Sequence, residues 1–370
     1  MVQDPLSLLE RVGLDPSGWS ITDLPHNRWL TPGIWQLERG DERVVVKWLS
    51  TFGDSGSTPW ENHWTLRSDE PKRWNFWARE PHAFQSNLVG SFSGEGMMAP
   101  RCLGVDVGSG DAVVVLEFVD GVPAEHWSIE QYAHAAHALG VAQASYATGQ
   151  RPFPEVDWLS QGFLRDYSTE KPVDWGLLDD DRAWNQPLII ECFPSELRGL
   201  ATELHGQSDR LLGIVEGLPR TLCHLDFWTK NLISASDGTV TLLDWAFFGV
   251  GAIGEDIGNL VPDSSFDHFV PSAQLPELDA AAFDAYTRGL ATGGWSGDSD
   301  LVQLAVWASA VKYDWLTPFM LASASAARQM TYGGAEEVDA AFRFRERGEV
   351  LLFNARRAIL ALDLASKLSL

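Results

Sequence analysis

The stretch "CHLDFWTKNL", residues 223–232, is followed by "TVTLLDW", residues 239–245, and together they decide how this sequence is interpreted. The first gathers Asp226 and Asn231 in one loop, and the second ends an apolar run with Asp244. Carboxylate and amide oxygens are the ligands that Mg²⁺ prefers, and a positioned carboxylate can deprotonate a hydroxyl. Asp226 and Asn231 alone are typical of a turn that satisfies its own backbone, but their spacing from Asp244 favours a phosphoryl-transfer site.

A lysine far upstream adds the remaining group that phosphoryl transfer from a nucleotide requires. Lys47 ends the run "RVVVK", residues 43–47, where strand alternation would hold its ammonium group over a nucleotide cleft. A lysine at a strand end is not expected in the core. The substitution Lys47→Ala is therefore expected to weaken nucleotide binding or turnover and to leave the fold intact.

These motifs in combination have a known counterpart. His-x-Asp-x-x-x-x-Asn, a strand ending in Asp and an upstream Val-Val-Val-Lys resemble the eukaryotic-protein-kinase-like fold. Asp-Trp at residues 244–245 replaces Asp-Phe-Gly, and Ala-Pro-Glu is absent, which resembles the aminoglycoside phosphotransferase / choline kinase family of small-molecule kinases. The motifs occupy residues 44–47, 116–119 and 222–256. The resemblance implies an α+β, bilobal protein-kinase-like fold, with a small β-rich N-lobe and a larger, mainly helical C-lobe.

The resemblance also implies residue roles at the nucleotide and the metal. Asp226 would be the catalytic base, with Asn231 and Asp244 as ligands of the Mg²⁺ cofactor. Glu80 would pair with the nucleotide lysine, and Glu61 is the alternative because Pro81 directly follows Glu80. The hinge backbone would contact the base of ATP or GTP. The residues expected at the nucleotide are Lys47, Glu80, Glu117, Phe118 and Val119.

Other residues of the same region are expected to support the loop or to contact the acceptor. His224 and Asp256 would be structural supports of the catalytic loop. Trp228 stands where protein kinases have a lysine, and Lys230 is a candidate for the missing cation. Acidic residues after the metal motif, and in the irregular insertion, could form an amine-binding rim, although each taken singly is more typical of solvated surface. The acceptor-binding candidates are Trp228, Glu255, Asp263 and Asp267, with residues 179–181 of the insertion.

The order of patterns along the chain indicates two lobes. An alternating hairpin is predicted over residues 33–49 and a buried strand over 111–119. A helix that begins after a Ser128 capping box is predicted over 128–147, another over 194–218, and mostly helix from 277 onward. Residues 57–88 are expected to be partly helical, and residues 150–195 an irregular insertion. The predicted division is 1–119, a nucleotide-binding lobe with the hinge strand, and 120–370, a catalytic and substrate-binding lobe.

The composition of the chain limits the kinds of partner that we expect for it. The chain has 370 residues, and 51 acidic against 27 basic residues give a net charge of −24, which disfavours nucleic acid as a partner. Such a charge favours a cationic acceptor, or it serves only solubility. Three distant cysteines indicate neither a disulfide framework nor a zinc site. No apolar run reaches the roughly 20 residues of a membrane span, so we expect a cytoplasmic protein without a membrane partner.

The sequence thus predicts an ATP- or GTP-dependent O-phosphotransferase that acts on a hydroxyl of a small molecule. The favoured acceptor is an antibiotic of aminoglycoside, nucleoside or cationic peptide type, modified for resistance or self-protection. A metabolic kinase of choline, an amino sugar or another sugar is the alternative, and a pseudokinase binding module is a third. "GVGAIG", residues 249–254, fits a dinucleotide fingerprint but lacks the strand–turn–helix context. The acceptor, the choice of ATP or GTP and the oligomeric state stay open.

Overall fold

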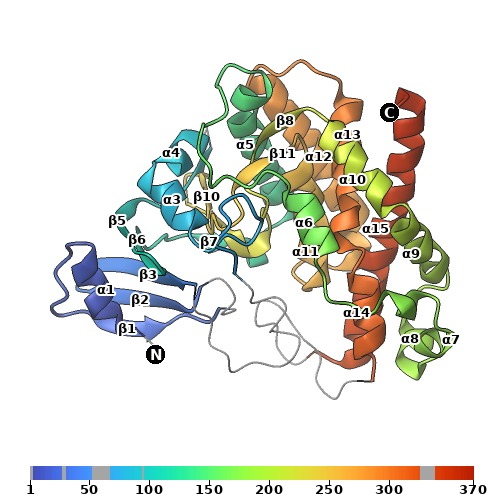
Figure 1. The fold of residues 1–370 in the computed structure, drawn as a ribbon, viewed down its shortest axis with the longest axis horizontal. Helices are drawn as coiled ribbons and strands as arrows, with labels where there is room; N and C mark the ends of the chain where they lie inside the picture. The colour runs from blue at the N-terminus through green and yellow to red at the C-terminus, as the bar shows by residue number, and fades with distance from the viewer. Residues whose placement is uncertain (1–2, 27–30, 52–66, 94–95, 326–337) are drawn as a thin grey trace.

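The computed structural model describes residues 3–26, 31–51, 67–93, 96–325 and 338–370. A five-stranded antiparallel sheet forms the N-terminal part, and helices make up most of the rest (Figure 1). The strand order in that sheet is β1-β2-β3-β6-β5. Its strands are β1 (Ser20–Asp23), β2 (Gly33–Arg39), β3 (Glu42–Ser50), β5 (Cys102–Val107) and β6 (Asp111–Glu117).

The predicted hairpin over residues 33–49 is confirmed as the antiparallel pair β2–β3, which turns at Gly40. Gly40 has φ +59°, a left-handed conformation that glycine adopts without steric cost. In β6 alternate residues face opposite sides of the sheet. Val113 and Val115 pack in the cluster that includes Leu8 of α1 (Pro5–Arg11), while Val114 packs in the main core. Both faces of the central strands are therefore buried.

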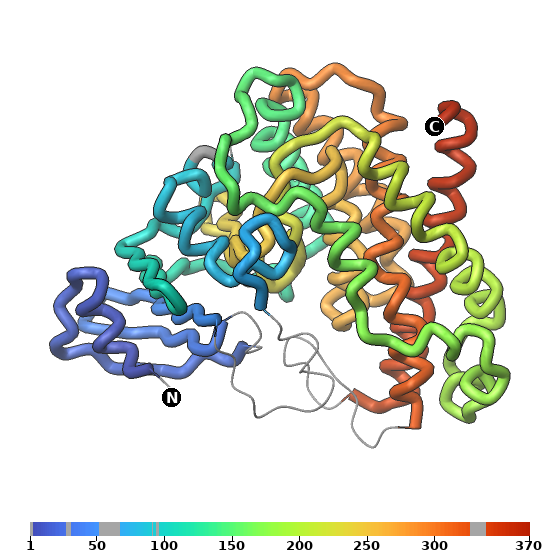
Figure 2. Tube along the Cα trace, in the orientation of Figure 1, coloured from blue at the N-terminus to red at the C-terminus, as the bar shows by residue number. Residues whose placement is uncertain are grey.

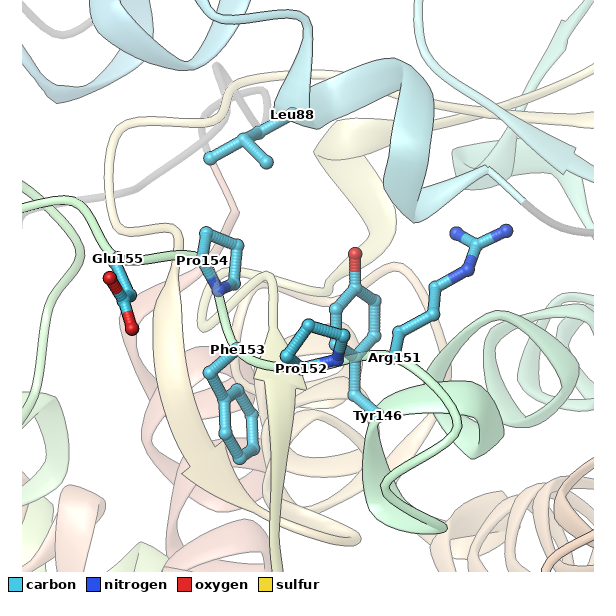
Figure 3. Close-up of a pocket in the computed structure, with 7 residues that line it drawn as sticks. All are labelled: Leu88, Tyr146, Arg151, Pro152, Phe153, Pro154 and Glu155. Atoms are coloured by element: carbon cyan, nitrogen blue, oxygen red, sulfur yellow. The ribbon is translucent and has the colours of Figure 1, made fainter.

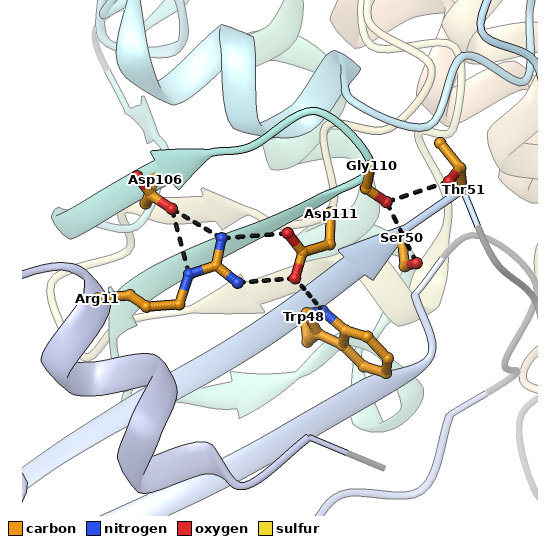
Figure 4. A network of polar contacts seen from close by, with 7 residues as sticks. All are labelled: Arg11, Trp48, Ser50, Thr51, Asp106, Gly110 and Asp111. Carbon is orange, nitrogen blue, oxygen red and sulfur yellow. Dashed lines mark hydrogen bonds and ion pairs between the residues drawn. The ribbon is translucent and has the colours of Figure 1, made fainter. Parts of the chain in front are cut away.

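A polar network fixes α1 to the edge of this sheet (Figure 4). The Arg11 guanidinium donates to Asp106 at 2.7 Å and to Asp111 at 2.7 Å. Asp111 also accepts a hydrogen bond of 3.1 Å from the Trp48 indole of β3. Hydrogen bonding with Asp111 raises the pKa of Arg11 above its ordinary value. The network joins α1 to the adjoining ends of β5 and β6.

The other face of the sheet is covered by α3 (Arg79–Gln85), which lies between the sheet and the helical part (Figure 1). Pro81 occupies the first turn of α3, where no intrahelical N–H partner is required, so it does not interrupt the helix. The helix expected within residues 57–88 is thus present at 79–85, while residues 57–66 lie outside the described residues.

Two long helices, α5 (Ile129–Ala147) and α12 (Leu275–Thr292), pack closely in the helical part. The Ser128 capping box is confirmed at the start of α5. Glycine permits the close packing, because a Cβ at Gly289 would lie 2.1 Å from the His137 carbonyl oxygen. Among the described residues, the remaining helices of more than five residues are α6 (Phe163–Thr169), α8 (Pro187–Cys192), α9 (Leu197–Gly206), α10 (Ser208–Gly217), α11 (Glu255–Phe266), α13 (Ser299–Ala308), α14 (Leu316–Ser323) and α15 (Ala340–Leu368).

Two expectations for the helical part change in detail. The helix predicted over 194–218 is two helices, α9 and α10, which meet at Gln207. The insertion of residues 150–195 is not wholly irregular, since it includes α6 and α8 as short helices. Figure 2 shows α15, in red, running along the outer side of the helical part beside α9, and the two are in contact. No helix among the described residues is long and apolar enough to cross a membrane.

Short strands frame the two motif stretches. A four-stranded sheet has the order β4-β10-β9-β7, and a second pair joins β8 to β11. The four-stranded sheet takes β4 and β7 from opposite sides of the predicted division at residues 119/120, and that division stays a prediction. The strands are β4 (Met97–Met98), β7 (Val122–Pro123), β8 (Arg220–Cys223), β9 (Leu232–Ser234), β10 (Val240–Leu242) and β11 (Gly249–Ala252).

Candidate active site

The loop between β8 and β9 holds Asp226 and Asn231 against each other. The Asn231 side-chain nitrogen donates to the Asp226 backbone oxygen at 2.9 Å and to its carboxylate Oδ2 at 2.8 Å. The neighbouring loop is attached here too, because the Leu243 N–H donates to the Asn231 carbonyl at 2.8 Å. Burial raises the pKa of Asp226 to about 7, with Asp244 and Asp263 acting in the same direction.

Asp256 of α11 stabilises this loop through hydrogen bonds with its backbone. Its buried carboxylate accepts hydrogen bonds from the backbone N–H groups of His224 at 2.9 Å and Leu225 at 2.7 Å, and from Gln143 Nε2 at 2.8 Å. Leu225 has φ +66°, which is unfavourable for a side chain with a Cβ and persists only where neighbouring contacts impose it. The bonds to Asp256 supply such contacts.

His224 lies inside the protein core. Its ring is fully buried and meets the Trp245 ring edge to face, with centroids 4.9 Å apart. Burial lowers the pKa of His224 to about 4, so the ring is neutral at pH 7. Neither His224 nor Asp256 is exposed to a bound substrate.

Lys47 of β3 reaches two carboxylates. Its Nζ lies 2.5 Å from Glu80 Oε2 of α3 and 3.6 Å from Asp244 Oδ1, in the loop between β10 and β11. Burial alone would lower the pKa of Lys47, but Asp244 and Glu80 raise it above its ordinary value. Lys47 is only 6% exposed, so the expectation that this lysine is not part of the core is wrong. Glu80 is the observed partner, and the alternative Glu61 lies outside the described residues.

Asp244 combines a strained backbone with an accessible carboxylate. Its φ is +58°, and its side chain is 38% exposed although Trp245 directly after it is buried. The Asn231 nitrogen is the atom that faces Asp226, which leaves the Asn231 side-chain oxygen, like the Asp244 carboxylate, as an oxygen that could bind a divalent cation. The described residues contain no group of three His, Cys, Asp or Glu that could enclose a metal. Mg²⁺ typically binds through one or two carboxylates together with substrate phosphates, which such an open arrangement suits.

The predicted hinge residues at the end of β6 and directly after it have side chains with partners in the structure. The Glu117 carboxylate accepts from the Arg101 backbone N–H at 2.9 Å and from Arg101 Nε at 3.2 Å. The Phe118 ring lies 4.5 Å from the Arg43 guanidinium carbon, and the Phe118 N–H donates to the Arg43 carbonyl at 3.2 Å. The Glu117 and Phe118 side chains thus have partners within the sheet region, and the role of residues 117–119 at a nucleotide base stays a prediction.

The residues expected to form an acidic rim are mostly paired or buried. Glu255 is 2% exposed, and its carboxylate accepts the Ala252 N–H at 2.9 Å, so it does not belong to a rim. Asp263 lies 3.5 Å from Lys312 Nζ, and the buried Asp267 lies 3.3 Å from Arg347 Nη2.

Asp181 in the insertion is exposed, whereas Trp228 in the loop between β8 and β9 is half-buried. In the insertion, Asp181 pairs with Arg198 at 2.8 Å and is exposed. Trp228 is half-buried and meets Phe269 edge to face at 6.3 Å. Of the acceptor-binding candidates, residues 179–181 are exposed, Trp228 and Asp263 are partly accessible, and Glu255 and Asp267 are buried.

Two basic residues near the site, Lys312 and Arg79, were not identified from the sequence, where Lys230 was named as the candidate cation instead. Lys230 does not supply a cation to Asp226, because its Nζ pairs with Glu125 at 2.7 Å. Lys312 is instead the cation that lowers the pKa of Asp226. It comes from the turn of residues 309–313, far along the chain, and no motif marks it. Arg79 was the second omission, although it directly precedes Glu80 in the sequence.

A surface pocket of about 580 Å³ has a lining of its own (Figure 3). It is lined by the end of α5 and the segment that follows, and by the first residue of α4 (Leu88–Phe92). None of its lining residues belongs to the predicted site. The lining residues are Leu88, Tyr146, Arg151, Pro152, Phe153, Pro154 and Glu155.

Comparison with known proteins places this geometry in context. The phosphotransferase enzyme family matches residues 56–296, which is more than half of the chain. Comparison with curated proteins finds no match.

Three solved structures show that the fold is shared. An aminoglycoside phosphotransferase from Alicyclobacillus acidocaldarius is 14% identical, with a TM-score of 0.57 over 98% of this chain and 97% of that one. A spectinomycin phosphotransferase in complex with ADP is 10% identical, with a TM-score of 0.52 over 95% and 97%. An amicoumacin kinase in complex with AMP-PNP and Ca²⁺ is 12% identical, with a TM-score of 0.51 over 89% and 87%. The predicted bilobal kinase-like fold is confirmed.

Proposed function

This chain belongs to the phosphotransferase enzyme family, and from that premise we propose that it transfers the γ-phosphate of ATP or GTP, with Mg²⁺, to a hydroxyl of a small molecule. The predicted enzyme class, a small-molecule phosphotransferase, is confirmed by the family match together with the fold. The donor, the metal, the acceptor and the residue roles belong to the proposal.

One observation carries the proposal. Lys47 lies between Glu80 at 2.5 Å and Asp244 at 3.6 Å, while the loop that holds Asp226 and Asn231 is hydrogen-bonded to the residue before Asp244. Phosphoryl transfer depends mainly on positioning and charge neutralisation, and these are the groups that it needs at one place.

Each residue has a separate task in this proposal. Lys47, held by Glu80, binds the α- and β-phosphates of the nucleotide. Asp244 and Asn231 supply the oxygen ligands of Mg²⁺, which would neutralise charge on the phosphates. Asp226 accepts the proton of the acceptor hydroxyl, and its hydrogen bond with Asn231 fixes the carboxylate orientation. A positioned acid–base group of this kind typically contributes about 10²–10⁴-fold in rate.

The acceptor that we favour is an antibiotic, and the biological result would be resistance or self-protection. The names of the three structurally similar proteins support this class, since they are kinases of an aminoglycoside, of spectinomycin and of amicoumacin. The net charge of −24 favours cationic acceptors among them. Because Asp263 and Asp267 are already paired with basic residues, this preference rests on the overall charge more than on a local rim.

The test is an ADP- and GDP-release screen of the purified chain with Mg²⁺, against antibiotics, amino alcohols and amino sugars. The proposal expects acceptor-dependent release with an antibiotic, and loss of that release in Asp226→Asn. Turnover of choline or an amino sugar would favour the metabolic alternative. If neither ATP nor GTP is turned over with any acceptor, the proposal fails and the binding-module alternative is favoured.

A further inference from the structure

Arg79 is a fully buried cation at the first position of α3, directly before Glu80. Its guanidinium forms no ion pair among the described residues and donates only to backbone carbonyl oxygens. The acceptors are Trp158 at 2.9 Å, Trp74 at 2.8 Å, Ala246 at 3.0 Å, Pro71 at 3.0 Å and Arg73. An arginine has five N–H donors, and these five carbonyls match that number.

A buried charge is costly unless hydrogen bonds replace the water that it loses. Burial lowers the pKa of Arg79 to about 9, which still leaves it charged at pH 7. An aliphatic side chain would avoid this cost but would leave the five carbonyl oxygens without these donors. The guanidinium therefore holds several carbonyls together and does more than fill volume.

The five carbonyls come from three segments that are distant in sequence. Pro71, Arg73 and Trp74 precede α3, Trp158 belongs to the insertion, and Ala246 lies two residues after Asp244. The insertion and the loop after Asp244 also contact each other directly, since the Ser160 N–H donates to the Phe248 carbonyl at 3.2 Å. Arg79 thus joins the helix that carries Glu80 to the loop that carries Asp244.

Both of these carboxylates depend on the same short loop. The Ala246 N–H faces Asp244 Oδ1 at 3.4 Å while its carbonyl accepts from Arg79. The Trp245 N–H faces Glu80 Oε1 at 3.4 Å. Asp244 holds a left-handed backbone at φ +58°, and such a conformation needs external contacts to persist.

We propose that Arg79 is a positioning residue that sets the Glu80 and Asp244 carboxylates relative to Lys47, and that couples the insertion around Trp158 to the nucleotide site. This inference rests on the proposed function, because it assigns Arg79 an effect on magnesium-nucleotide binding. Arg79 touches neither the nucleotide nor the acceptor in this account, and it acts through α3 and the loop of residues 244–246.

The experiment compares Arg79→Lys with Arg357→Lys. Arg357 is a matched control, because it is also buried but pairs with Asp279 at 3.0 Å in the helical part. Lysine keeps the charge but has three donors in place of five and lacks the planar fork, so it leaves at least two of the five carbonyls without a donor. We expect Arg79→Lys to weaken Mg-ATP binding at least tenfold in calorimetry and to raise the Mg²⁺ concentration for half-maximal binding. Arg357→Lys should change either quantity by less than threefold.

A double-mutant cycle on Mg-ATP affinity, measured below the melting temperature of every variant, separates coupling from a general loss of stability. If Arg79 acts through the Lys47 site, the effects of Arg79→Lys and Lys47→Met on Mg-ATP affinity are less than additive. Additive effects, or an Arg79→Lys variant with unchanged affinity and Mg²⁺ requirement, would overturn the inference while leaving the proposed function in place. A wild-type chain that fails to bind any nucleotide would instead overturn both.

Hydrogen exchange of the wild-type chain provides a measurement that does not depend on a folded variant. Saturating Mg-ATP should slow exchange together at residues 245–248 and 158–160. Protection confined to residues 245–248 would contradict the proposed coupling of the insertion to the nucleotide site.

Discussion

Removal of the Lys47 ammonium group should destabilise the fold as well as nucleotide binding. Glu80 is 1% exposed and Lys47 is its nearest cation, at 2.5 Å, so Lys47→Met leaves a carboxylate buried without its charge partner. Breaking a buried pair from one side typically costs about 3–5 kcal/mol. At about 2–4 °C per kcal/mol for domains of 150–250 residues, and less for a chain that unfolds as a larger unit, the melting temperature should fall by up to roughly 6–20 °C.

The double variant Lys47→Met/Glu80→Gln separates the two effects. Replacement of both charges removes the uncompensated carboxylate, so we expect it to regain at least half of the lost melting temperature. It should not regain Mg-ATP affinity, because the phosphates have lost their cation. Calorimetric melting of wild type, single and double variants, with Mg-ATP titrations of each, tests both points. A single variant as stable as wild type, or a double variant less stable than the single one, would refute the buried pair.

Three further predictions concern supports of the site and of the sheet. Asp256→Ala leaves two buried backbone N–H groups without acceptors, so urea unfolding should show a loss of about 2–6 kcal/mol, and an unchanged midpoint would contradict the brace. Arg11→Ala should lower the free energy of unfolding by about 1 kcal/mol at low salt and by less at 1 M salt, since its ion pairs with carboxylates are partly exposed. A loss of stability that does not depend on salt would contradict this contribution of the ion pairs. The hydrogen bond with Asp314 raises the pKa of His205 in the folded state. The stabilisation from the His205–Asp314 pair is therefore full below about pH 6.5 and is lost as the pH rises through the folded-state pKa of His205. Melting temperatures at pH 5.5 and pH 8.5 for wild type and Asp314→Asn check this, and an equal pH dependence in both would exclude the pair as its source.

The sequence predicted those parts of the site whose residues are close in the chain or end a strand. Asp226 and Asn231 share one loop, and the alternation before Lys47 sets its side, so local patterns were sufficient to name these residues as candidates. Arg79 and Lys312 act through tertiary contacts with segments distant in sequence, and no local pattern marks such contacts. The acidic rim was over-predicted at Glu255 because sequence does not show that its carboxylate turns back to the Ala252 N–H.

The burial of Lys47 was missed for a related reason. A lysine after three valines ends an apolar strand, and the sequence does not show whether a helix covers that end. In the structure α3 covers it and supplies Glu80. The same limit applies to the helix predicted over 194–218, where the break at Gln207 has no proline to mark it.

The measurement that tests the central claim most directly is Mg-ATP calorimetry, beside single-turnover rates, for Asp226→Asn and Asp244→Asn. Asp226→Asn keeps the shape of the side chain but removes the proton acceptor, so it should lose about 10²–10⁴-fold in rate and bind Mg-ATP nearly normally. Asp244→Asn removes a charged ligand of Mg²⁺, so both affinity and rate should fall, with partial recovery at high Mg²⁺. If Asp226→Asn abolishes nucleotide binding while Asp244→Asn leaves it intact, the assigned roles are wrong and the proposed mechanism fails with them.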